Sequence, residues 1–292
     1  MIVSLLVACD DATGSGAGGA SASSGSVGST QASTGQASSG QGTTGATSSG
    51  ATSSASTGTG MGCPLLVDTF DGAALSPCWT ALNGPGSASP LFSVALASGA
   101  LHLVATNGAS GVWYQGSTKS LLYQTVAADH FKVTTTVHPR KRTNANAAPT
   151  NPLHVGGLMV RDPASNGGAT ESYVFIMAGS NEQAQPGVEV KSTTNGVSLF
   201  SEPVWADPLA ADLRVCRLGS DFYLYKRVVG SGAWQLADHQ GEAKPIARPD
   251  LPMTVQVGLA LNFNGPDNDL DVAFDAVDLG PSPATAADCT SD

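Results

Sequence analysis

The chain has 292 residues and a formal net charge of −10 at pH 7, from 13 basic and 23 acidic side chains. Its first basic residue is Lys119. Because phosphate backbones bind positively charged surfaces, this composition argues against nucleic acid as a partner. The predicted elements follow in chain order.

Residues 1–9 form a short apolar start. Ile2–Ala8 are too few to span a bilayer. The string Leu6-Val7-Ala8-Cys9 resembles the lipobox of bacterial lipoproteins, although the basic region and longer apolar core of that pattern are missing. The resemblance implies a truncated signal segment over residues 1–9, lipidation of Cys9, and export to the outer membrane or cell surface. Contact with the membrane would then occur only through the lipid anchor.

A low-complexity segment follows. From Ala12 to Gly60, 45 of 49 residues are Gly, Ser, Thr or Ala. Such a stretch has almost no apolar surface whose burial could offset the entropy cost of ordering its backbone. We therefore expect a disordered linker over residues 10–61 and a single domain over residues 62–292.

Four cysteines lie in the predicted domain, and an even number in an exported domain favours two disulfides. Sandwich termini are often adjacent, which favours Cys63–Cys289 together with Cys78–Cys216. The alternative is a local Cys63–Cys78 bridge, with Cys216 and Cys289 forming the second bridge.

The domain alternates apolar and polar residues with a period of two, which is typical of strands with one buried face. The run 254–263 places Val255, Val257, Leu259, Leu261 and Phe263 on one face. Turn residues separate these runs, and no amphipathic helix is evident. We predict an all-β, two-sheet antiparallel sandwich, with strands at 64–70, 91–96, 100–106, 111–115, 120–126, 130–137, 154–161, 171–178, 186–192, 196–200, 211–218, 221–228, 233–238, 254–263 and 269–279.

The order of motifs over residues 66–279 resembles a concanavalin A-like jelly roll. The most specific of these motifs is Gly156–Arg161, which reads Gly-Gly-Leu-Met-Val-Arg. The motifs also resemble the "regulation of enolase protein 1-like" family and the C-terminal sandwich domains of β-xylosidases. Because this fold carries hydrolases, lectins and proteins of unknown function, the resemblance implies architecture and leaves function open.

A sugar-binding groove is the first functional hypothesis, because sugars suit aromatic platforms with planar polar partners. If Leu158 and Val160 point into the core, Arg161 lies on the opposite face, alongside the polar side of 254–263. The alternative is that Trp113 is a core residue and Arg161 pairs with a neighbouring Asp for stability. The predicted ligand-binding residues are Trp113, Tyr114, Gln115, Arg161, Tyr173, Glu189, Gln256 and Asn262.

A structural Ca²⁺ is a weaker hypothesis, with Asp68, Asp71 and Asp275 as ligands if the first and last strands pair. No cofactor is otherwise expected. No alternating Glu-x-Asp-x-Glu run occurs, so no catalytic residue is assigned.

We therefore expect a monomeric, non-catalytic carbohydrate-binding or adhesion module with a polysaccharide or glycan partner. One alternative is a glycoside hydrolase or lyase with an unrecognised carboxylate pair. Another is a structural envelope protein that binds a second protein.

Overall fold

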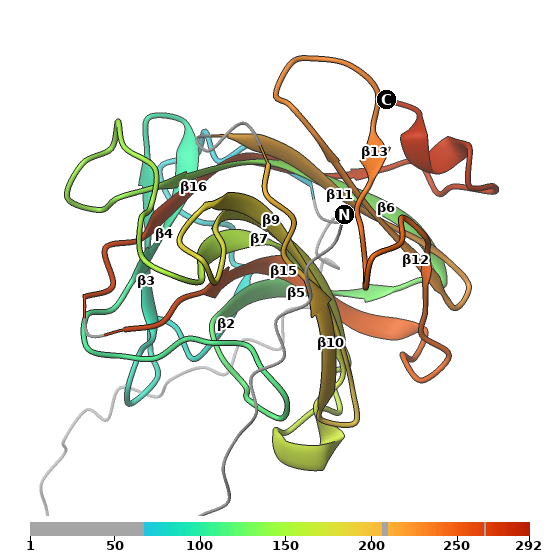
Figure 1. Cartoon of the computed structure of the whole chain (residues 1–292), viewed down its shortest axis with the longest axis horizontal. Helices are drawn as coiled ribbons and strands as arrows, with labels where there is room; N and C mark the ends of the chain where they lie inside the picture. The colour runs from blue at the N-terminus through green and yellow to red at the C-terminus, as the bar shows by residue number, and fades with distance from the viewer. Residues whose placement is uncertain (1–66, 206–209, 266) are drawn as a thin grey trace, which may run out of the picture. The chain divides into compact units, whose positions relative to one another are not determined.

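The structure is a computed structural model that describes residues 67–205, 210–265 and 267–292. Within these residues, two antiparallel sheets pack face to face (Figure 1). This confirms the predicted all-β, two-sheet jelly-roll sandwich. None of the helices in the described residues is long and apolar enough to span a bilayer.

The larger sheet has nine strands among the described residues. Seven of them run in the order β13-β12-β11-β6-β16-β4-β3, while β1 pairs with β16 and β14 pairs with β12. Its strands are β1 (Val67–Asp68), β3 (Phe92–Ala97), β4 (Ala100–Ala105), β6 (His130–Arg140), β11 (Ala211–Leu218), β12 (Asp221–Arg227), β13 (Gln235–Leu236), β14 (Ile246–Ala247) and β16 (Asp271–Gly280).

The smaller sheet has seven strands among the described residues, in the order β10-β9-β8-β7-β15-β5-β2. Two short 3₁₀ helices complete the described elements, η1 (Gly168–Thr170) and η2 (Asp288–Thr290). The seven strands are β2 (Thr80–Leu82), β5 (Leu121–Ala127), β7 (His154–Arg161), β8 (Tyr173–Ser180), β9 (Pro186–Thr194), β10 (Val197–Ser201) and β15 (Thr254–Asn262).

The main core lies between the sheets and follows the predicted alternation. All five apolar residues assigned to one face of 254–263 lie in it, as do Leu158 and Val160 of β7. Strand β15 is central and pairs with β5 on one side and β7 on the other. The period-two alternation therefore predicted correctly which residues of β7 and β15 face the core.

The outer face of the seven-stranded sheet, the side turned away from this core, differs from the prediction. Every residue of β7 and β8 is buried. A second apolar cluster covers this face, and it includes Met159, Phe175, Met177 and Ala260. The polar side of 254–263 is therefore buried as well from Gln256 to Asn262, whereas Thr254 is exposed.

The favoured disulfide pairing is wrong. Cys216 of β11 is bonded to Cys289 of η2, with 5.7 Å between their Cα atoms. Cys289 belongs to a C-terminal segment that docks on β11, where the Arg214 guanidinium donates to the Cys289 carbonyl oxygen at 2.9 Å. Cys78 is also disulfide-bonded. The alternative pairing is thus confirmed for Cys216–Cys289.

Several predictions fall on residues 1–66, which lie outside the described residues. They are the signal segment, lipidation of Cys9, the linker and the bonding of Cys63.

Candidate functional site

The segment 111–120, hereafter the plug loop, lies on the outer face of the seven-stranded sheet. The prediction of a strand at 111–115 is wrong, because residues 111–114 have no regular secondary structure. Trp113 is 0% exposed, and its ring meets that of Tyr173 edge-on, with 5.3 Å between centroids. Its indole nitrogen donates to the Ser120 carbonyl oxygen at 3.3 Å. Trp113 therefore fills the face that the sequence predicted to be a groove.

Two glycines of the plug loop, one at its start and one near its middle, stand where the backbone approaches other atoms closely. A Cβ on Gly111 would lie 2.2 Å from the Phe263 ring, and one on Gly116 would lie 2.5 Å from the Cα of Gly168. The Gly168 amide donates to the Gly116 carbonyl oxygen at 2.8 Å. Only glycine allows the loop to sit this close to the sheet and to the 165–170 turn.

Buried polar side chains bind the backbone of the plug loop. The Trp113 amide donates to Asn262 Oδ1 at 2.9 Å, and Lys191 Nζ donates to the Trp113 carbonyl oxygen at 2.8 Å. Asn262 Nδ2 in turn donates to Glu189 Oε2 at 2.7 Å, and Glu189 Oε1 pairs with Lys191 Nζ at 2.6 Å. These contacts give hydrogen-bond partners to the buried amide and carbonyl groups of Trp113. Buried backbone groups need such partners because leaving them unpaired costs free energy.

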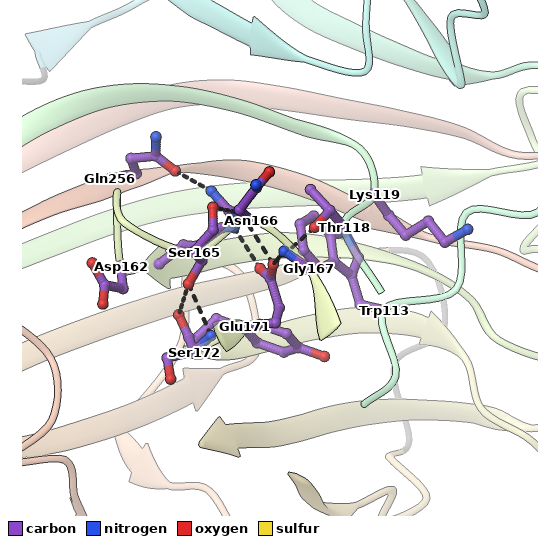
Figure 2. Close-up of polar contacts among 12 residues, drawn as sticks. Trp113, Thr118, Lys119, Asp162, Ser165, Asn166, Gly167, Glu171, Ser172 and Gln256 are labelled. Atoms are coloured by element: carbon purple, nitrogen blue, oxygen red, sulfur yellow. Dashed lines mark hydrogen bonds and ion pairs between the residues drawn. The ribbon is translucent and has the colours of Figure 1, made fainter. Parts of the chain in front are cut away.

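A second buried ion pair lies under the other end of the loop (Figure 2). The Arg161 guanidinium binds both oxygens of the Glu171 carboxylate, at 2.5 and 3.1 Å, and donates to Gln256 Oε1 at 2.8 Å. Gly167 and Thr118 also donate to Glu171 Oε2, at 2.9 and 2.8 Å, and dashed lines mark these contacts in Figure 2. The pair fixes the plug loop to the sheet.

The structure brings most of the predicted binding residues together but buries them. The prediction that they line an open groove is wrong for Trp113, Arg161, Tyr173, Glu189, Gln256 and Asn262, since each is at most 8% exposed. The competing interpretation is observed for Trp113, which is buried, and Arg161 does pair with an acid, but its partner is Glu171 and not an Asp. Tyr114 and Gln115 remain at the surface, on the outer side of the plug loop.

A pocket of about 260 Å³ opens beside Tyr114, hereafter the Tyr114 pocket. Tyr114 is 44% exposed and Phe200 of β10 is 40% exposed, and their rings meet edge-on with 6.2 Å between centroids. Lys191 Nζ lies 5.6 Å from the Tyr114 ring centroid and 5.1 Å from that of Phe200. The complete lining consists of Val112, Tyr114, Leu153, Glu182, Lys191, Phe200 and Glu202.

One buried side chain, Asn181, organises the rim of this pocket. Its Oδ1 accepts the amides of Gln183 and Gln185, at 3.0 and 2.9 Å, which closes the turn that carries Glu182. Its Nδ2 donates to the Glu202 carbonyl oxygen at 3.3 Å. Asparagine suits this position because its amide forms both kinds of bond locally. The two glutamates are thereby placed at one rim.

The two rim carboxylates are electrostatically linked. Glu202 Oε2 accepts the Glu182 amide at 2.9 Å. Burial raises the pKa of Glu202, with smaller raising contributions from Glu189 and Glu182, while the Glu182 amide and Lys191 oppose the shift. A carboxyl with a raised pKa that borders an aromatic-lined pocket can donate or accept a proton as pH changes.

A second cavity, of about 390 Å³, lies where β5, β6 and the end of β16 meet. Its main polar side chains already have partners, because His130 pairs with Asp129 at 3.0 Å and Ser282 donates to the His130 carbonyl oxygen at 3.0 Å. The rest of its lining is small or apolar. The Tyr114 pocket is the better candidate because it combines exposed aromatic rings with charged groups.

The structure does not bring the predicted calcium ligands together. Asp68 accepts the Trp79 indole at 2.8 Å, and Asp275 pairs with His138 at 2.8 Å. Within residues 67–205, 210–265 and 267–292, no group of three or more His, Cys, Asp or Glu side chains could hold a metal ion. The predicted Asp68, Asp71 and Asp275 set is therefore not a metal site in this structure.

Sequence reasoning missed Phe200, Glu182 and Glu202. Phe200 was assigned only to a strand, since periodicity does not show that β10 is the outermost strand of its sheet. The Asn181 turn did carry a signal, because Asn followed by polar residues between two strands is typical of a turn. The pocket forms only when this turn, β10 and the plug loop meet.

Comparisons with known proteins bear on the fold. No protein-family model and no curated protein sequence matches the chain. The structure is similar to a xylan β-1,4-xylosidase from Bacillus halodurans C-125, with a TM-score of 0.56 over 74% of this chain and 19% identity. It is also similar to the GH43 protein BlXynB from Bacillus licheniformis, with a TM-score of 0.54 over 73% of this chain and 16% identity. The chain spans 39% and 38% of those two proteins. At identities this low, the structural similarity shows a shared sandwich fold and nothing about function.

Proposed function

We propose that the domain is a non-catalytic carbohydrate-binding module and that it binds a sugar in the Tyr114 pocket. The observation that carries this proposal is the exposed Tyr114–Phe200 pair above charged groups. Sugar rings present apolar C–H faces and peripheral hydroxyls, which suit aromatic surfaces bordered by polar groups. The pocket is slightly smaller than the range of roughly 300–1,000 Å³ typical of drug-sized ligands, so it suits one end or one ring of a longer glycan.

A rigid base supports the proposed binding site. Lys191 and Glu189 are buried beneath the pocket and hold the plug loop through Trp113 and Asn262. A recognition surface held by satisfied buried contacts loses little conformational freedom when its ligand binds. The buried network thus acts as the support, and Tyr114 and Phe200 as the contact surface.

The proposal includes the location of the module. Lipidation at Cys9 and a linker over residues 10–61 would display a monomeric domain at the bacterial cell surface, away from the membrane. The support is the lipobox-like string and the composition of residues 12–60. Labelling of expressing cells with a fatty acid analogue tests this part. Label should appear on the natural chain and be absent from Cys9→Ala, and label on both would overturn it.

A glycan array probed with the full chain tests binding, and isothermal titration then measures affinity for the strongest hit. Xylan fragments belong in the array, since a xylosidase shares the fold. We expect Tyr114→Ala and Phe200→Ala each to weaken binding by at least about two- to twelvefold, because an aromatic contact contributes about 0.5–1.5 kcal/mol beyond its buried area.

The matched control is Tyr223→Ala, which removes a half-buried aromatic ring from β12 of the other sheet. Its affinity should equal that of the natural chain. The proposal fails if no glycan binds, or if all three variants bind as the natural chain does.

Glycoside hydrolysis is the second candidate function. It is favoured by the presence of Glu182 and Glu202 in one pocket and by burial, which raises the pKa of Glu202. Hydrolysis requires a carboxyl that stays protonated and a second that is ionised. Release of reducing ends from the bound glycan, lost in Glu202→Gln, would establish catalysis. Binding without release would leave the binding module as the function.

A further inference from the structure

Resting on this proposed binding site, we infer that the Tyr114 pocket selects amine-bearing sugars over neutral ones and discriminates against uronate sugars. The inference comes from the charges that line the pocket. Glu182, Glu202 and Lys191 are its charged residues. Whether the pocket attracts cations or anions depends on which of these charges already have partners.

The positive charge of Lys191 is already neutralised. Its Nζ pairs with Glu189 Oε1 at 2.6 Å and donates to the Trp113 carbonyl oxygen at 2.8 Å. Both Lys191 and Glu189 are buried, so a ligand that displaced either contact would leave a buried charge without its partner. Lys191 is therefore part of the support and is not available to bind a sugar carboxylate.

The two rim carboxylates lack such a partner. Among the described residues, neither Glu182 nor Glu202 forms an ion pair, and Glu202 accepts only the uncharged Glu182 amide at 2.9 Å. With Lys191 neutralised by Glu189, the rim carries an uncompensated negative charge. Burial raises the pKa of Glu202, and Glu189 and Glu182 add to this rise, while the Glu182 amide and Lys191 oppose it.

The rings add to the preference for a cation. Lys191 Nζ already lies over part of both rings, 5.6 Å from the Tyr114 centroid and 5.1 Å from that of Phe200. The ring area that is exposed to solvent can still attract the ammonium group of a ligand. A sugar that carries an amine could stack its ring on these side chains while its ammonium group meets a rim carboxylate. A sugar carboxylate in the same place would face two like charges, and an N-acetylated sugar would gain nothing from them.

Isothermal titration of the full chain at pH 7 and low salt tests the inference. The probes are a glucosamine oligosaccharide, its N-acetylated counterpart and a galacturonate oligosaccharide of equal length. We expect the amine form to bind about tenfold more tightly than the acetylated form, and the galacturonate to bind more weakly than both. The amine advantage should shrink with added salt, because screening weakens exposed charge pairs.

Variants show whether the rim carboxylates cause the preference. Glu182→Gln with Glu202→Gln should bring the amine and acetylated forms to equal affinity. The matched control, Asp71→Asn with Glu242→Gln, makes the same change in net charge at exposed carboxylates outside the pocket. It should keep the tenfold preference.

The failures of the two proposals can be told apart. Binding of all three oligosaccharides with equal affinity, or a preference that survives the double rim variant, overturns this inference and leaves the binding module standing. Lack of binding by every probe and every array glycan overturns both. An oligolysine that competes as well as the glucosamine oligosaccharide would show recognition of charge alone and overturn the sugar assignment.

Discussion

Replacing Trp113 by alanine separates the two roles that this residue could have. In the structure the indole is fully buried beneath the plug loop, packed on Tyr173 and bonded to the Ser120 carbonyl oxygen. A buried tryptophan removes about 200 Å² from water. At about 25 cal/mol per Å², its burial contributes about 5 kcal/mol, which agrees with the measured range of about 3–5 kcal/mol for Trp→Ala in cores.

Urea unfolding followed by far-UV circular dichroism measures this cost without relying on tryptophan fluorescence. We expect Trp113→Ala to lose about 3–5 kcal/mol of unfolding free energy. Trp113→Phe should lose less, because it keeps an aromatic ring against Tyr173 and gives up only the bond to Ser120 and part of the buried volume of the indole. Trp205→Ala is a control, since this half-buried ring packs at the edge of the main core and should cost less than Trp113→Ala.

The refuting result is specific. If Trp113→Ala kept its stability within about 1 kcal/mol but lost glycan binding, the indole would be a ligand platform and its burial here would be rejected. If stability falls and Trp113→Phe still binds glycan, Trp113 supports the pocket without contacting the ligand.

Three further predictions concern stability. Arg161→Ala should cost about 3–5 kcal/mol of unfolding free energy, because it leaves Glu171 buried without its partner. In urea unfolding, the double variant Arg161→Met with Glu171→Gln should lose less unfolding free energy than the sum of the losses of the two single variants. Replacing Cys216 and Cys289 by alanine should cost about 4 kcal/mol for a bridge that spans 73 residues, and an unchanged urea midpoint would contradict this. Because burial raises the pKa of Glu202, the folded state holds that proton more tightly than the unfolded chain does. Glu202→Gln should therefore have a higher Tm than the natural chain at pH 7 and an equal Tm below about pH 4, and an advantage that persisted in acid would contradict the proposed cause.

The strands were largely predictable because alternation is a local property of the chain. The predicted ranges 154–161 and 211–218 match β7 and β11 at both ends. The failure at 111–115 has a physical reason. Val112 and Tyr114 alternate with Trp113 as strand residues do. Within the described part of the chain, however, the segment pairs with no strand, and side chains bind the amide and the carbonyl group of Trp113 instead.

The candidate site was predictable only in part. Arg161, Gln256 and Asn262 were correctly placed on one face, because β7 and β15 each alternate and turn their apolar residues toward the core. Their exposure could not be predicted, because it depends on a loop that arrives from elsewhere in the chain. For Cys216 the favoured disulfide partner was wrong and the alternative, Cys289, was right, since any of several pairings satisfies the same cysteine count.

The sequence by itself determined the composition of the two parts of the chain, the all-β class and the inward face of most strands, since each of these follows from local residue patterns. Tertiary structure alone decided that the plug loop fills the outer face, that Cys216 meets Cys289, and that Tyr114, Phe200, Glu182 and Glu202 share a pocket. The physical reason is the separation of the contacting residues along the sequence. These contacts join segments far apart in the chain, whose meeting is fixed by the packing of the whole sandwich.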